Sequence, residues 1–105
     1  MKIAIKISNY HLSFINEMIA DYLPAEQKGF RKEDKSLFYL MNEIAAKLLK
    51  KAIDKKGTSK PFTITLKYYE AFTLHKFILI YMDYEEGEKK RVTREILGTI
   101  NQKLT

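Results

Sequence analysis

Two short segments of this chain alternate between apolar and polar residues, and they limit its fold more than any other feature. In residues 2–7, KIAIKI, every second residue is an isoleucine. In residues 62–68, FTITLKY, apolar residues alternate in the same way with threonine and lysine. A period of two is typical of a strand with one buried and one exposed face. The sequence therefore predicts two half-buried strands, and Pro61 stands at the edge of the second, where proline is tolerated.

The sequence predicts two helices after the first strand, because apolar residues recur there at helical spacing. Ser8 or Asn9 is suited to cap the first helix, and Pro24 is expected to close it. Residues 24–35 contain turn formers and charge without periodicity, which predicts a loop. A second helix follows and is expected to stop at Gly57. The expected buried positions are Leu12, Ile15, Ile19 and Tyr22 in the first helix, and Leu37, Leu40, Met41, Ile44, Leu48 and Ala52 in the second.

The segment after the second strand is either a helix or the returning strand of a hairpin. A hairpin needs a turn, but residues 69–76, YEAFTLHK, contain no Gly, Pro, Asn or Asp. The sequence therefore favours a helix, and because Leu79 and Ile80 fall outside its apolar face, we expect it to be the central one. After the turn EEGE at 85–88 a last helix is predicted. The expected buried positions are Leu74, Phe77, Ile78, Tyr81 and Met82, and then Val92, Ile96, Leu97, Ile100 and Leu104.

The predicted order is strand, helix, helix, repeated once. This order describes a single α+β domain over residues 1–105, with similar halves at about 1–57 and 61–105. Because two helices return the chain between the strands, we expect the strands to pair antiparallel in a two-stranded sheet packed against four helices. A two-stranded ribbon has two open edges, so either the helices cover them or a second copy of the chain extends the sheet as a homodimer.

The charge of the chain favours acidic partners. The formal net charge is +6, and it comes from sixteen lysines and three arginines against thirteen acids. Such an excess attracts phosphate-rich molecules at long range. Lysine also serves as a general solubilising residue, and base and phosphate recognition favour the arginine fork, in which this chain is poor. DNA or RNA is therefore one candidate partner among others.

Nothing in the sequence predicts a membrane segment or a targeting segment. The longest apolar run, FILIYM at 77–82, is far too short to cross a bilayer. Lys6 interrupts the apolar start of the chain, which differs from a signal peptide. There are no cysteines for disulfides or thiolate metal sites. We expect a soluble cytoplasmic protein.

The sequence carries no catalytic or metal-binding signature. His11 and His75 each fall near the predicted first turn of a helix, but their spacing brings no carboxylate such as Glu70 or Asp21 to them. The acidic run DYEEGE at 83–88 departs from the calcium-loop spacing. Glycine-rich phosphate loops are absent. We therefore expect a protein that is not an enzyme and that uses no metal or cofactor.

A short alternating strand followed by two helices resembles the ribbon-helix-helix family of DNA-binding repressors, and two such units in one chain would mimic the family's usual dimer. The resemblance implies that the strand pair enters the major groove and that the amino terminus of a helix holds a phosphate. The residues that it assigns to nucleic-acid binding are Lys2, Ala4 and Lys6 in the first strand, Thr63, Thr65 and Lys67 in the second, and the backbone near Thr93, which opens the run TREIL. The long 24–35 segment and the lack of arginine in the strands depart from the family pattern.

Seven tyrosines suggest a protein partner as the alternative to nucleic acid. A core of this size cannot bury Tyr10, Tyr39, Tyr68, Tyr69 and Tyr84 together. Exposed tyrosine beside lysine favours contact with another protein. Tyr68 and Tyr69 are adjacent, so at least one would point outward from a strand, and this pair is the expected contact site of a binding or inhibitory module.

Overall fold

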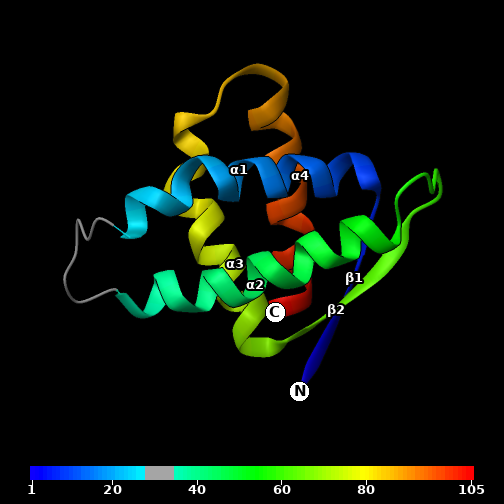
Figure 1. The fold of residues 1–105 in the computed structure, drawn as a ribbon, viewed down its shortest axis with the longest axis horizontal. Coiled ribbons are helices and arrows are strands. Elements are labelled where there is room, and N and C mark those ends of the chain that lie inside the picture. The colour runs from blue at the N-terminus through cyan, green and yellow to red at the C-terminus, as the bar shows by residue number, and fades with distance from the viewer. Residues whose placement is uncertain (28–34) are drawn as a thin grey trace.

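The computed structural model describes residues 1–27 and 35–105 and confirms the α+β class. Two similar halves follow each other, each with a strand and two helices (Figure 1). The elements are β1 (Lys2–Ile7), α1 (Asn9–Gln27), α2 (Lys35–Asp54), β2 (Phe62–Lys67), α3 (Tyr68–Tyr81), a short 3-10 helix (Met82–Tyr84) and α4 (Gly87–Leu104).

The two strands pair antiparallel, as the sequence predicts. Lys2 lies opposite Lys67 and Ile7 lies opposite Phe62, so the strands match over their full lengths. Their burial alternates residue by residue, and the apolar positions face inward. The buried face consists of Ile3, Ile5 and Ile7 of β1 and Phe62, Ile64 and Leu66 of β2.

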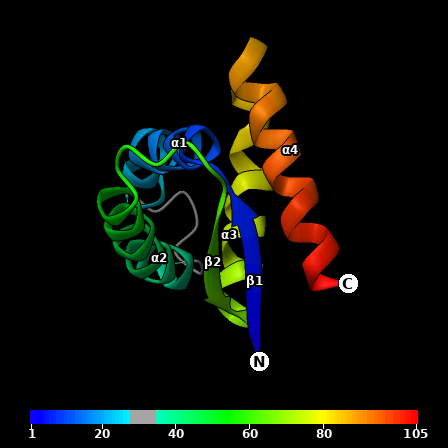
Figure 2. The same ribbon diagram turned by 90° about the vertical axis from the view of Figure 1, so that its right-hand side faces the viewer.

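The helices cover only the inner face of this ribbon. Figure 2 shows α1 and α2 stacked on one side, α4 on the other, and α3 behind the strands. Both α3 and α4 contact the ribbon, α1 packs along α2, and α3 packs along α4. The buried side chains that join these layers include Leu12, Met41, Ile44, Leu48, Leu74, Phe77, Val92 and Ile100. The other face of the ribbon remains open to solvent.

Two predicted boundaries around α1 are wrong. The helix does not close at Pro24 but continues to Gln27. Proline at this position removes one N–H and leaves one carbonyl, that of Ala20, without its helical partner, which is a small loss near the end of a long helix. Residues 24–27 of the predicted 24–35 loop therefore belong to α1, and Lys35 belongs to α2. Residues 28–34 lie outside the described part of the chain.

The segment after β2 is a helix, and its start is earlier than predicted. The strand ends at Lys67, and Tyr68 is the first residue of α3. The helix buries Phe77 and its neighbours, but it is not enclosed on all sides. Phe72 is 54% exposed and Leu79 is 48% exposed. One side of α3 therefore faces solvent, because the neighbouring helices and the ribbon contact only its other sides.

A buried carboxylate fixes the junction between β2 and α3. Glu70 is 7% exposed. Its Oε1 accepts a hydrogen bond of 2.7 Å from the backbone N–H of Lys67 and one of 2.9 Å from Nζ of Lys47 on α2. Burial alone would raise the pKa of Glu70, but the hydrogen bond from the Lys67 amide and the charge of Lys47 outweigh it, so this pKa lies below its usual range. Glu70 thus caps α3 and joins it to α2.

We predict that Glu70→Gln destabilises the fold at neutral pH by about 1 kcal/mol, because hydrogen bonds to a charged acceptor are stronger than those to a neutral one. A carboxyl whose pKa is lower in the folded chain stabilises the fold above its unfolded pKa and loses this contribution as the pH falls through its folded pKa. The difference between wild type and variant in urea unfolding should therefore be present at pH 7 and disappear in acid. Glu43→Gln, on the exposed face of α2, serves as the control. Equal stabilities of wild type and Glu70→Gln at pH 7 would contradict this role.

Candidate nucleic-acid interface

The six side chains assigned to base reading all lie on the open face of the ribbon. Each of them is exposed, since burial alternates along both strands. The register places Lys2 opposite Lys67, Ala4 opposite Thr65 and Lys6 opposite Thr63. The structure thus brings the predicted residues together on one surface, which we call the outer ribbon face. None of the six carries a negative charge.

One end of the outer ribbon face holds two lysines directly opposite each other. Like charges at such cross-strand positions repel and destabilise the pair. Among the described residues, no carboxylate forms a salt bridge with Lys2, Lys6 or Lys67. The ammonium of Lys67 instead lies 5.8 Å from the ring centre of Tyr69. This arrangement leaves the three ammonium groups exposed without a direct ion pair in the described part of the chain, although the Glu70 carboxylate interacts electrostatically with Lys67.

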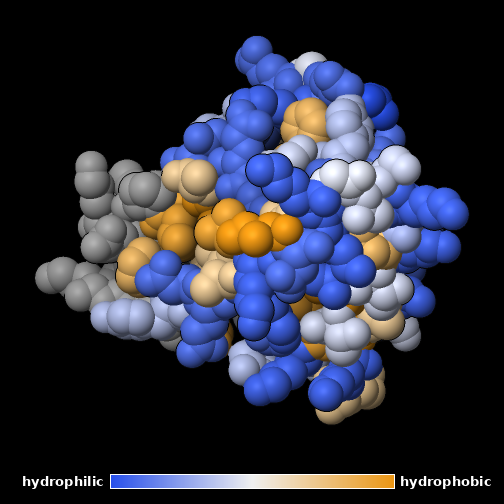
Figure 3. Space-filling view, turned by 45° about the vertical axis from the view of Figure 1, so that its right-hand side comes forward, coloured by the Kyte–Doolittle hydropathy of each residue, from blue (hydrophilic) through white to orange (hydrophobic). Residues whose placement is uncertain are grey.

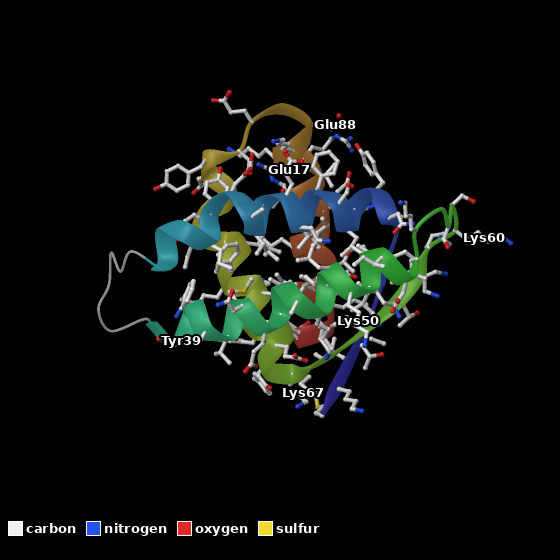
Figure 4. All side chains as sticks on the ribbon, in the orientation of Figure 1. Glu17, Tyr39, Lys50, Lys60, Lys67 and Glu88 are labelled. Carbon is white, nitrogen blue, oxygen red and sulfur yellow. The ribbon has the colours of Figure 1, made fainter. Side chains whose placement is uncertain are left out.

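The turn between α2 and β2 adds positive charge at the other end of the ribbon. Lys56 and Lys60 are exposed there, and Figure 4 shows Lys60 and Lys67 far apart along the strands. The side chain of Asn9 anchors this turn by donating to the backbone carbonyls of Lys55 at 2.6 Å and Thr58 at 2.8 Å. Asn9 therefore does not cap α1, which leaves that role to Ser8.

The acidic residues gather at the opposite end of the molecule. Figure 4 places Glu17 and Glu88 there, far from Lys67. Glu17 accepts a hydrogen bond of 2.6 Å from Lys89, and Glu88 lies 3.5 Å from Arg91. Lys89 and Arg91 at this end are thus paired with acids, whereas in the described part of the chain Lys2, Lys6 and Lys67 of the ribbon form no salt bridge. The surface consequently has one basic and one acidic end.

The structure does not place Thr93 where a helix amino terminus could bind a phosphate. The resemblance needs its backbone amide at the start of a helix, but α4 begins at Gly87. Thr93 lies inside the helix, with its side chain buried. Amides beyond the first turn are bonded to carbonyls of the preceding turn and cannot hold an anion. The sequence pattern TREIL misplaced the beginning of this helix by about two turns.

The five tyrosines that a core of this size cannot bury together are all exposed: Tyr10, Tyr39, Tyr68, Tyr69 and Tyr84. Tyr68 and Tyr69 do not belong to a strand, as their pattern suggested, but open α3. Both rings reach solvent, and Phe72 follows one turn later on the same helix. We call Tyr68, Tyr69 and Phe72 the aromatic patch. Figure 3 shows that hydrophobic residues gather in places on an otherwise largely hydrophilic surface.

The two histidines occupy different environments. His11 lies in the first turn of α1, as predicted, and its Nε2 is 3.1 Å from Oε2 of Glu95 on α4. His75 lies in the middle of α3, so the prediction that it falls near the first turn of a helix is wrong. Within residues 1–27 and 35–105, no three His, Asp or Glu side chains are grouped closely enough to hold a metal ion.

We predict that Lys2→Glu raises the free energy of unfolding by about 0.2–1 kcal/mol, because it replaces a cross-strand repulsion with an attraction to Lys67. Lys6→Glu is the matched control, since its cross-strand neighbour is the uncharged Thr63. Urea unfolding at low salt measures both. An equal effect of the two substitutions would show that the two lysines do not interact.

No protein-family model matches the chain, and neither curated proteins nor solved structures give a significant match. In the described part of the chain, no helix combines the length and the apolar character that crossing a bilayer requires. Any conclusion about function therefore depends on the geometry of the surface itself.

Proposed function

We propose that this protein binds nucleic acid, in the first place duplex DNA, through the outer ribbon face. The observation that carries the proposal is the cross-strand pair of Lys2 and Lys67, which stands on an exposed face and in which, among the described residues, neither lysine forms a salt bridge. A phosphate backbone would supply the missing negative charge and replace condensed counterions on the nucleic acid. The two ammonium groups, which repel each other in the free protein, would then both attract the phosphates of the ligand.

The shape of the ribbon supports the same proposal. The major groove of B-DNA admits a two-stranded antiparallel ribbon, and the outer ribbon face is a continuous strip of short and basic side chains. Thr63 and Thr65 can donate to or accept from base edges, whereas Ala4 can only contact a thymine methyl group. Because the acidic end lies away from the ribbon, it would point away from the phosphates.

We predict that Lys6→Glu and Lys67→Glu each weaken the binding of duplex DNA and reduce the salt slope of log Kobs by about one phosphate contact. Fluorescence anisotropy with a random-sequence duplex at low and near-physiological salt measures both quantities. Lys76→Glu is the matched control, since it makes the same charge change on α3, which packs on the other side of the ribbon.

Two outcomes would contradict the proposal. One is binding by Lys6→Glu and Lys67→Glu that equals wild type. The other is an equal loss of affinity in Lys76→Glu, because it would show that net charge, and not the ribbon, governs the interaction.

A second candidate function is association with a protein through the aromatic patch. Tyr69 is 45% exposed although tyrosine burial would contribute to the stability of a core of this size. Aromatic side chains beside lysine are typical of the energetic centre of protein interfaces. The partner is either another protein or a second copy of this chain.

For a second copy, we predict that light scattering gives twice the 12.4 kDa mass of one chain and that Tyr69→Ala lowers the mass to that of the monomer. The melting temperature of the monomer should change little, because the ring is exposed. Tyr39→Ala, on α2, is the control. If wild type is monomeric at high concentration, the partner must be a different protein. If Tyr69→Ala then captures that protein as well as wild type does, the candidate function is contradicted.

A further inference from the structure

A serine, a histidine and a glutamate form a continuous hydrogen-bonded chain where β1 meets α1. Oγ of Ser8 lies 2.7 Å from Nδ1 of His11, and Nε2 of the same ring lies 3.1 Å from Oε2 of Glu95. Ser8 and His11 are close in sequence, whereas Glu95 comes from α4 on the other half of the chain. We call these residues the Ser8–His11–Glu95 cluster.

The surrounding bonds determine where the protons of the cluster lie. Oγ of Ser8 already accepts a 3.2 Å hydrogen bond from the backbone N–H of His11. The hydrogen bond from His11 is the largest influence on Glu95 and, with the nearby Arg91, lowers the pKa of its carboxyl, so this group is ionised at neutral pH and can only accept. A neutral His11 must therefore carry its proton on Nε2 toward Glu95, and its Nδ1 is left to accept the proton of the Ser8 hydroxyl. This is the polarity by which a histidine activates a serine.

The glutamate is itself held in place. Its second oxygen, Oε1, accepts a 2.9 Å hydrogen bond from Arg91 one turn earlier on α4. Arg91 also contacts Glu88, which accepts a hydrogen bond from the hydroxyl of Tyr10 on α1. The orientation of the His11 ring is thus fixed from two helices, as a general base requires.

The cluster opens into a hollow of about 280 Å³ on the surface. Ser8, His11 and Glu95 line it together with the apolar side chains of Ile5, Ile7, Pro61 and Ile96, and Lys6 and Thr99 complete the lining. Ser8 lies between the last residue of a strand and the first residue of a helix. The amides of Asn9 and Tyr10 have no acceptor within α1, because they precede its first helical hydrogen bond.

We propose that Ser8 is a nucleophile, activated by His11 and Glu95, that cleaves small esters with an apolar acyl group. The hydroxyl oxygen of Ser8 forms a bond to the acyl carbon while its proton moves to Nδ1 of His11. The carbon–oxygen bond to the leaving alcohol then breaks, and the alcohol takes that proton. Water next attacks the acyl–serine ester and gives a proton to His11, which returns it to Oγ of Ser8 as the acid is released. The sum of these steps is the addition of water to the ester.

The apolar walls of the hollow would accommodate the acyl chain, and the first-turn amides would stabilise the negative oxygen of the intermediate. The site is distinct from the aromatic patch on α3 and from the lysine pair at the far end of the ribbon. The hollow shares Lys6 with the outer ribbon face, but labelling of Ser8 needs no nucleic acid and therefore tests this proposal separately.

The test is covalent labelling with a short alkyl fluorophosphonate, followed by intact-mass spectrometry and peptide mapping. In this reaction Oγ of Ser8 bonds to phosphorus, fluoride leaves and the proton goes to His11. We expect one adduct, located on Ser8, and a labelling rate that falls by about 10²-fold or more in His11→Gln, the contribution of a general base. Ser8→Asn should abolish the adduct, since asparagine retains the ability to cap α1 but has no hydroxyl.

Ser13→Ala is the matched control, because Ser13 lies on the same helix and its Oγ is bonded to the carbonyl of Tyr10. It should label as wild type does and hydrolyse p-nitrophenyl butyrate at the same rate. Absence of an adduct on the wild-type chain, or an adduct on any residue other than Ser8, would overturn the proposal. The mapping uses the wild-type chain, so this result stands even if Ser8→Asn fails to fold.

Discussion

The pairing of β1 with β2 is the interaction on which the rest of the structure depends. The two strands come from opposite halves of the chain, and their buried isoleucines, Phe62 and Leu66 form the floor on which α3 and α4 pack. Burial of this apolar surface is the main stabilising contribution. Since the period of a strand is two, commitment of one face to the core requires that the other face be exposed. The pairing of β1 with β2 therefore joins the two halves and also places Lys2, Lys6 and Lys67 on one exposed surface.

The pairing of surface charges differs between the outer ribbon face and the acidic end of the molecule. At the acidic end of the molecule, Lys89 and Arg91 are paired with carboxylates, whereas within residues 1–27 and 35–105 the lysines of the outer ribbon face form no salt bridge. A paired surface charge contributes little to long-range attraction, but an unpaired one contributes fully. The lysines of the outer ribbon face thus offer a polyanion positive charge that no direct ion pair within the described residues offsets. This distribution, more than the net charge of +6, supports the proposed function.

Local signals in the sequence were sufficient for the elements but not for their contacts. Alternation over residues 2–7 and 62–67 predicted both strands and their outward residues, and the absence of turn formers after Lys67 predicted α3. The end of α1 was missed because a proline near a helix end costs only one hydrogen bond. The contacts of Asn9 with Lys55 and of His11 with Glu95 were also missed, because these residues lie 46 and 84 positions apart and no local pattern links them. The Ser8–His11–Glu95 cluster exists only once α4 has packed beside α1.

The most direct test of the outer ribbon face is a backbone amide NMR titration of the protein with a short DNA duplex. We expect the amide shifts to change mainly along residues 2–7 and 62–67 and in the turn near Lys60, while residues 83–88 at the acidic end remain unchanged. The changes should diminish as salt is raised, because released counterions contribute much of the binding free energy. Changes centred on the acidic end or on the aromatic patch, or no changes at low salt, would contradict the account.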